Sequence, residues 1–102
     1  MYNILKYKMI LLNPNDYVLM YFTTSSYKNK KYDAILENKY DGTIKKIPFG
    51  DTRYQQYQDR LGFYKHLDHG DKKRRDLYRR RHNKDIVNKY SSGWFSWYYL
   101  WT

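Results

Sequence analysis

Aromatic side chains supply most of the large apolar surface that this chain can bury. Its 102 residues include 14 Tyr, 4 Phe and 3 Trp, whereas Leu, Ile, Val and Phe together number only 21. So low a content of Leu, Ile, Val and Phe is close to the range of disordered chains. Disordered chains, however, are poor in aromatic residues. Tyr and Trp each join a broad apolar face to a polar tip. The sequence therefore predicts one small folded domain with an aromatic-rich core.

The first half of the chain has the pattern of an antiparallel sheet. Residues rich in β-formers, bounded by turn residues, predict strands at 17–24, 32–38 and 43–49. The Asp41-Gly42 pair favours a hairpin between the last two. Pro48 cannot donate a hydrogen bond to a neighbouring strand, so the third strand is expected to end there or to lie at a sheet edge.

The N-terminal segment is less well defined. Residues 2–12 alternate only loosely and could form a strand or a flexible leader. Lys6 and Lys8 interrupt the apolar run, so neither a signal peptide nor a membrane span is expected. We therefore divide the single domain into residues 1–29, a leader plus a strand, and residues 30–102, its core.

The second half of the chain predicts helices. Helical spacing predicts a helix over residues 52–61, with Asp51 as its N-cap and Gly62 at its end. Two further helices are predicted, residues 72–82 behind an Asp71 cap and residues 93–101 behind a cap at Ser91 or Ser92. The expected fold class is α+β, with a small antiparallel β-meander followed by two or three short helices packed on one face.

Positive charge is concentrated in the predicted helix at 72–82 and just beyond it. The chain has a net charge of +10, and between residues 72 and 84 eight of thirteen residues are Lys or Arg. Only Asp76 opposes them, and the cations in the first turn oppose the helix dipole. Three interpretations remain open: contact with nucleic-acid phosphates, docking on an acidic capsid or core protein, and an ordinary solvated helix face. The candidate contact residues are Lys72, Lys73, Arg74, Arg75, Arg79, Arg80, Arg81 and Lys84.

Five tyrosines alternate with these and other basic residues, namely Tyr54, Tyr57, Tyr64, Tyr78 and Tyr90. Single-stranded nucleic acids are held by such mixtures of rings and cations. A core with few aliphatic residues must also use Tyr, however, and no known nucleic-acid-binding motif accompanies them. Most of these rings are therefore expected in the core or at a protein interface.

Histidines and carboxylates gather near "HLDHGD" at residues 66–71. His66, His69 and His82 could hold a metal or transfer protons, but their spacing matches no metal-binding motif. The simpler interpretation is a turn in which Asp68 and Asp71 cap the next helix and bond nearby Arg. The chain has no cysteine, which excludes disulfides and cysteine-based zinc sites. We expect no catalytic residues, no metal and no cofactor.

The aromatic C-terminus, "GWFSWYYLW", predicts a helix that is buried against the domain or against a partner. Trp94, Trp97, Tyr98 and Trp101 would share one face, and Phe95 and Tyr99 another. If only the tryptophan face is buried internally, Phe95 and Tyr99 form an exposed apolar patch, which is typical of a protein interface. This patch could support a homo-oligomer.

Three stretches, taken in order, resemble a known family. They are "KKYDAILENKYDGTIKKIPFG" (30–50), "DHGDKKRRDLYRRRH" (68–82) and "SSGWFSWYYLW" (91–101). They are similar to a family of small basic proteins of unknown function from large nucleocytoplasmic DNA viruses, the giant viruses and their algal-virus relatives. The resemblance implies a viral setting and a place in the virion, with the host cytoplasm or viral factory as the location before assembly. The family has no established catalytic residues to carry over.

These observations lead to a ranked set of functions. The first is a non-enzymatic virion component, a minor capsid or inner-virion protein that contacts acidic partners through the basic helix. The alternative is a sequence-tolerant nucleic-acid-binding module that grips the phosphate backbone. The third is a metal-assisted enzyme built on His66, His69 and His82.

Overall fold

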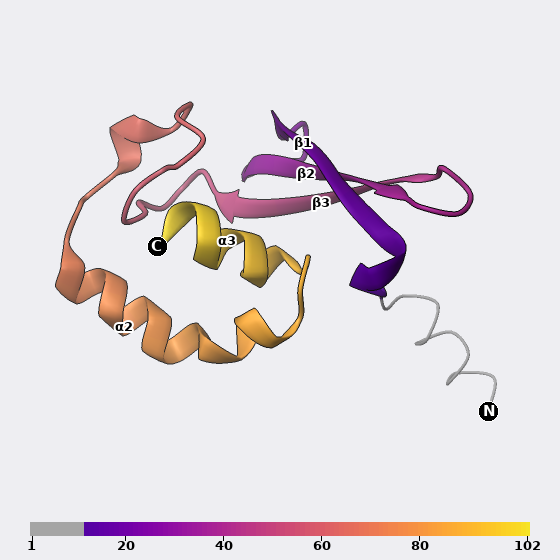
Figure 1. The fold of residues 1–102 in the computed structure, drawn as a ribbon. Helices are drawn as coiled ribbons and strands as arrows, with labels where there is room; N and C mark the ends of the chain where they lie inside the picture. Colours follow the sequence, from indigo (N-terminus) through magenta and orange to yellow (C-terminus); the bar gives the residue numbers. More distant parts are fainter. Residues whose placement is uncertain (1–11) are drawn as a thin grey trace.

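The protein is a three-stranded antiparallel sheet followed by two helices, as expected for a small α+β fold (Figure 1). The computed structural model describes residues 12–102, so the strand or leader predicted before Leu12 lies outside the described residues. The elements are β1 (Tyr17–Thr24), β2 (Lys30–Asn38), β3 (Ile44–Asp51), α2 (Lys72–His82) and α3 (Ser92–Leu100), with short 3-10 turns at η1 (Pro14–Asp16), η2 (Lys65–Leu67) and η3 (Asn83–Val87). Among the described helices, none has the length and apolar character needed to cross a membrane.

The three predicted strands are confirmed, with bounds shifted by at most two residues. They pair in the order β1-β2-β3, and β3 forms an edge of the sheet. This position explains how Pro48 is tolerated within β3. The hairpin turn is closed by the Asn38 side chain, which accepts hydrogen bonds from the backbone N–H groups of Tyr40 and Asp41. Gly42 supplies the positive φ that the turn requires, at +73°.

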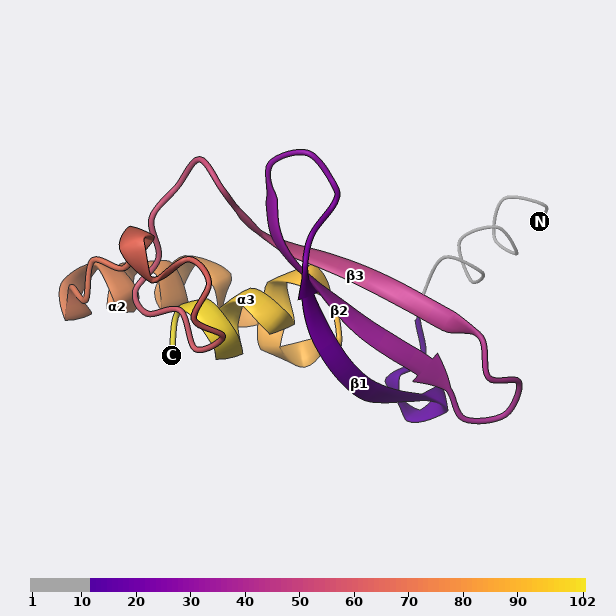
Figure 2. The ribbon, with the colours of Figure 1, turned by 90° about the horizontal axis from the view of Figure 1, so that it is seen from above.

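The core lies on one face of the sheet and is mainly aromatic. Tyr32, Ala34 and Leu36 of β2 point to this face, and α3 crosses it (Figures 1 and 2). Phe95 of α3 stacks on Phe49 of β3, with ring centroids 5.4 Å apart and an interplanar angle of 24°. α3 lies between the sheet and α2 (Figure 1), so α2 is held mainly by its contacts with α3 and the loops.

The prediction of an exposed apolar patch at Phe95 and Tyr99 is wrong. Phe95 is fully buried in the core, and Tyr99 is half-buried against Phe22, with ring centroids 4.7 Å apart. The helix turns this side to the sheet because the flat Phe95 ring fills the space above Phe49. The side of α3 that faces outward instead carries Tyr98, which is 41% exposed.

The prediction of a helix at residues 52–61 is also wrong. Asp51 is the last residue of β3 rather than a helix cap, and residues 52–71 form an irregular connection. The backbone N–H groups of Gln58 and Arg60 donate to the carbonyls of Leu100 and Tyr99, at 3.0 Å each. This segment therefore satisfies the carbonyls left unpaired at the end of α3. Bonds to a distant helix end replace the local bonds that a helix would have made.

The caps of the two remaining helices follow the prediction closely. Asp71 accepts hydrogen bonds from the backbone N–H groups of Lys73 and Arg74, and these bonds lower the pKa of its carboxyl group. Ser91 accepts from the N–H of Trp94 and is the N-cap of α3. Ser92 instead donates to the carbonyl of Pro48 at 2.6 Å, which ties α3 to β3.

Candidate anion-binding surface of helix α2

Helix α2 packs against the domain through aromatic rings, although it has no fully buried residue. The Tyr78 ring lies between two others. It stacks on Trp101 with centroids 4.1 Å apart and planes 4° apart, and on His82 with centroids 4.2 Å apart and planes 23° apart. Burial raises the pKa of the Tyr78 hydroxyl to about 12. The contact between α2 and the rest of the domain is thus centred on a tyrosine.

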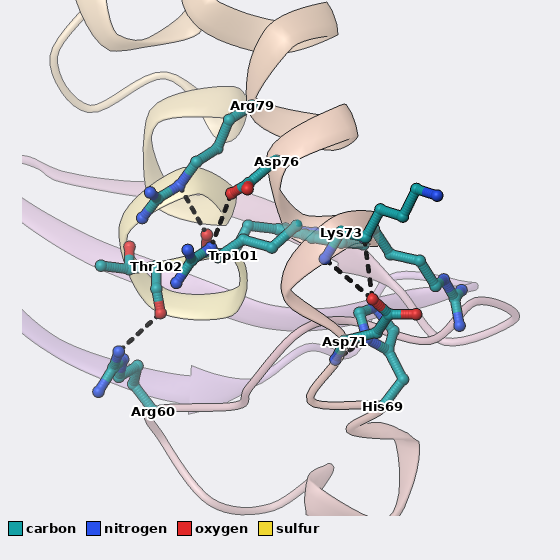
Figure 3. Close-up of polar contacts among 10 residues, drawn as sticks. Arg60, His69, Asp71, Lys73, Asp76, Arg79, Trp101 and Thr102 are labelled. Atoms are coloured by element: carbon teal, nitrogen blue, oxygen red, sulfur yellow. Dashed lines mark hydrogen bonds and ion pairs between the residues drawn. The ribbon is translucent and has the colours of Figure 1, made fainter.

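Two of the candidate arginines belong to this contact. Arg79 donates from Nε to the carbonyl of Trp101 at 3.2 Å (Figure 3). Its guanidinium lies 5.6 Å from the centre of the Trp97 ring. Arg75 lies 4.9 Å from the centre of the Tyr57 ring and donates to Asp76 at 3.2 Å. Because both guanidinium groups are half-buried and engaged, they serve the packing of α2.

The end of the chain is held in place by further polar contacts. Arg60 donates to the carbonyl of Thr102 at 2.7 Å (Figure 3), and the Thr102 hydroxyl donates to the carbonyl of Trp97 at 2.6 Å. These bonds fix the position of Trp101, and Trp101 in turn supports α2. The aromatic C-terminus is therefore the platform on which the basic helix rests.

Four candidate residues form what we call the outer face, made of Lys72, Lys73, Arg80 and Lys84. All four are exposed. Within residues 12–102, none of these side chains has a hydrogen-bond or ion-pair partner by the usual distance criteria. The one acidic residue of α2, Asp76, is engaged by Arg75. The outer face thus carries four positive charges that the described fold leaves available to an external anion.

The remaining two candidates, Arg74 and Arg81, face a groove. It has a volume of about 700 Å³ and lies between α2, the start of α3 and the adjoining ends of β2 and β3. Arg74 donates to the side-chain oxygen of Gln55 at 3.0 Å. The structure therefore divides the eight predicted contact residues into three sets, of which one packs the helix, one lines this groove and one forms the outer face.

A buried polar cluster holds the connection at 52–71, and sequence reasoning missed it. Lys31 donates to the carbonyl of Tyr54 at 2.9 Å and to the side chain of Gln56. Tyr32 donates to Asp59 at 2.5 Å, and Asp68 accepts from the Gln56 amide at 2.6 Å. Asp68 also accepts from the N–H of Asp59 at 2.7 Å, so the prediction that Asp68 caps the following helix is wrong.

In this cluster, burial and the surrounding polar groups act in opposite directions on the pKa values of Lys31 and Asp59. Burial lowers the pKa of the Lys31 ammonium, while Asp59 and other carboxylates act against it. Burial also disfavours ionised Asp59, but hydrogen bonds from Tyr32 and from the backbone N–H groups of Tyr64, Leu61 and Gly62 outweigh it, so the pKa of this carboxyl lies below its usual range. No sequence pattern distinguishes Lys31 from an exposed lysine, because the partners that bury it are remote in the chain.

The three histidines occupy separate positions. His66 lies beside Tyr64, and His69 lies between Tyr57 and Trp101. Nδ1 of His69 accepts from the N–H of Asp71 at 2.9 Å, and burial lowers the pKa of this imidazole. His82 pairs with Asp85 at 3.1 Å. Within residues 12–102 there is no group of three His, Cys, Asp or Glu side chains that could hold a metal ion.

Comparison with known proteins finds no protein-family model, no curated protein and no solved structure that matches this chain.

Proposed function

We propose that this protein is a non-enzymatic, sequence-tolerant nucleic-acid-binding protein that contacts the phosphate backbone with the outer face, which spans α2 and the start of η3. The observation that carries the proposal is the set of four exposed cations at Lys72, Lys73, Arg80 and Lys84, none of which has an internal partner within residues 12–102. Lysine and arginine side chains on one helix neutralise neighbouring phosphates and release their counterions. Such contacts position a protein on nucleic acid without reading its sequence.

The aromatic residues support backbone contact over base recognition. Tyr90 is in the core, and Tyr57, Tyr64 and Tyr78 are half-buried against other rings. Of the five tyrosines considered for base stacking, only Tyr54 is largely exposed, at 65%. The tyrosines that alternate with the basic residues therefore offer little base stacking.

The resemblance to small basic proteins of large DNA viruses gives this proposal a setting. In a virion, a protein of this kind would lie inside the particle against the packaged genome, as an inner-virion or minor capsid component. An acidic capsid or core protein is the second candidate partner, and the same four cations would serve it. Only the nucleic-acid partner predicts that the protein binds random oligonucleotides with an affinity that falls steeply as the salt concentration rises.

The experiment is a binding titration with random duplex and single-stranded oligonucleotides over a series of salt concentrations. The test variant replaces Lys72, Lys73, Arg80 and Lys84 with Gln. The matched control replaces four exposed lysines that lie outside the outer face with Gln, namely Lys28, Lys39, Lys45 and Lys46. Arg75 and Arg79 are left unchanged because they pack the helix.

We expect the outer-face variant to bind at least ~10-fold more weakly, with a salt slope smaller in magnitude by about 0.9 for each lost phosphate contact. The control should retain most of its affinity, and different sequences should bind alike. Equal losses in the two variants would show that only net charge matters. Absence of binding by the unaltered protein at low salt would exclude nucleic acid and leave the acidic protein partner.

A further inference from the structure

The groove between α2, α3 and the ends of β2 and β3 is a second concave surface, distinct from the outer face. Its volume of about 700 Å³ lies within the range of small-molecule sites. Cationic side chains reach it from three parts of the chain: Lys30 and Lys31 from β2, Arg53 from the connection, and Arg74 and Arg81 from α2. These parts are remote in sequence, and only folding brings their charges together.

The carboxylates in the groove are already paired. Asp51 accepts two bonds from the Arg53 guanidinium, at 3.0 and 2.7 Å, and Asp85 pairs with His82 at 3.1 Å. Arg74 has only a neutral amide partner, at Gln55, and neither Lys30 nor Arg81 has an ion-pair partner within residues 12–102. Three cations, Lys30, Arg74 and Arg81, therefore line this concave space without an ion-pair partner within residues 12–102. Like charges gathered in a concave space reinforce one another's potential.

The same groove offers little to a flat aromatic ligand. Tyr78 lines it, but both faces of this ring are covered, by Trp101 and by His82. Trp101 is itself covered by Tyr78 on one side and lies 5.4 Å from His69. Recognition in the groove would thus come from charge, and guanidinium forks match phosphate oxygens well. Because the cations lie on different walls of the groove, an anion that carries several phosphates can engage more of them at once than a single phosphate.

We propose that this groove binds a compact polyphosphate anion, meaning two or more adjacent phosphates, held by Arg74 and Arg81 of α2 and by Lys30 on the opposite wall. Inorganic polyphosphate and the phosphate chain of a nucleoside triphosphate share this chemistry. The site is independent of the nucleic-acid contact, because it uses a different side of α2.

The test is calorimetric titration of the full chain with inorganic tripolyphosphate, ATP and orthophosphate at low ionic strength. The groove variant is Arg74→Gln with Arg81→Gln. The matched control is Lys73→Gln with Arg80→Gln, which removes the same charge from the outer face of the same helix. We expect tripolyphosphate to bind with a Kd below about 1 mM. The groove variant should lose at least about tenfold in affinity, while the control should change little.

ATP should bind about as well as tripolyphosphate, and orthophosphate much more weakly. Backbone amide NMR shifts in the unaltered protein should map to Arg74, Arg81 and Gly93, a readout that does not depend on how the variants fold. Equal losses in the two variants, absence of tripolyphosphate binding, or orthophosphate binding as tight as tripolyphosphate would each overturn the proposal. ATP binding far tighter than tripolyphosphate would overturn recognition by charge alone.

A duplex oligonucleotide added to the same series separates the two proposals. DNA affinity should fall in the outer-face control and persist in the groove variant, the reverse of the tripolyphosphate result. If the unaltered protein binds tripolyphosphate but not DNA, only the proposed function is refuted. If it binds DNA but not tripolyphosphate, only the groove proposal is refuted.

Discussion

Tyr78 of the basic helix stacks on Trp101, the penultimate residue of the chain, with ring planes 4° apart and centroids 4.1 Å apart. Phe95 and Leu100 anchor α3 in the core, but α2 has no buried residue of its own. The stack is therefore the principal contact that holds the charged helix to the domain, and the position of the basic surface depends on it.

Replacing Trp101 with Ala should release α2 while the sheet and α3 persist. We expect the free energy of unfolding to fall by about 2 kcal/mol, since a half-buried ring and an aromatic pair are lost. Hydrogen exchange should rise in the amides of α2 more than in those of α3. Trp101→Phe keeps a ring for Tyr78 and should lose much less. A uniform rise in exchange across the chain would contradict this local role.

Asp59 should control the acid stability of the connection at 52–71. It accepts from the Tyr32 hydroxyl at 2.5 Å and from the N–H groups of Leu61 and Tyr64 at 2.8 and 2.7 Å. Asp59→Asn replaces one accepting oxygen with an NH₂ group that can only donate, so at least one of these donors loses its partner. We expect a loss of about 2–3 kcal/mol in the free energy of unfolding at neutral pH.

The sign of the pH dependence follows from the lowered pKa of the Asp59 carboxyl in the folded state. The stabilisation is present above the unfolded pKa of ~4 and is lost as pH falls through the folded pKa. Urea unfolding of both proteins between neutral pH and the acid limit checks this. The difference in stability between the unaltered protein and Asp59→Asn should shrink below about pH 4. Asp51 and Asp71 also have lowered pKa values, but both proteins contain them, so their contributions cancel in the difference. A difference that is constant with pH would contradict the role of the carboxylate.

The elements that follow from local pattern were predictable, and those set by remote partners were not. The three strands and the caps at Asp71 and Ser91 depend on alternation and on bonds within three residues. The segment at 52–61 has helical spacing, yet its N–H groups bond to the end of α3, some forty residues further along the chain. No local pattern carries that information.

The candidate surface was predictable in composition but not in geometry. The eight basic residues are evident in the sequence, but their division is not: Arg75 and Arg79 pack the helix because Tyr57 and Trp97 lie beside them. The periodicity of α3 defined two faces correctly but could not say which one meets the sheet. Phe95 was therefore placed outside, and it lies in the core.

Gly93 at the start of α3 should be required only because Asp85 packs against it. A Cβ at this position would lie 2.5 Å from Cγ of Asp85. In the unaltered protein, Gly93→Ala should therefore lower the free energy of unfolding by about 1–3 kcal/mol. In an Asp85→Ala background the two closest obstructing atoms are gone and only the Cβ of residue 85, at 2.9 Å, remains. The same change should then cost less than about 1 kcal/mol, because the smaller clash is offset by the helix preference of Ala. Urea unfolding of the four proteins measures this coupling, and equal losses in both backgrounds would show that Asp85 is not the obstacle.

Tyr78 should also make the protein sensitive to alkali. Burial, with Asp85 nearby, raises the pKa of its hydroxyl to about 12, against ~10 in the unfolded chain. The stabilisation this provides is fully present below pH ~10 and is lost as pH rises through the folded value of about 12.

Tyr78→Phe keeps the ring between Trp101 and His82 but removes the titrating hydroxyl. In urea unfolding from neutral pH upward, the variant should lose less stability above pH ~10 than the unaltered protein. Tyr32, whose pKa is also raised by burial and by its bond to Asp59, remains in both proteins, so the difference between the two curves isolates Tyr78. Parallel curves across the alkaline range would mean that the Tyr78 hydroxyl titrates alike in the folded and unfolded chains, and that the stack does not shield it from water.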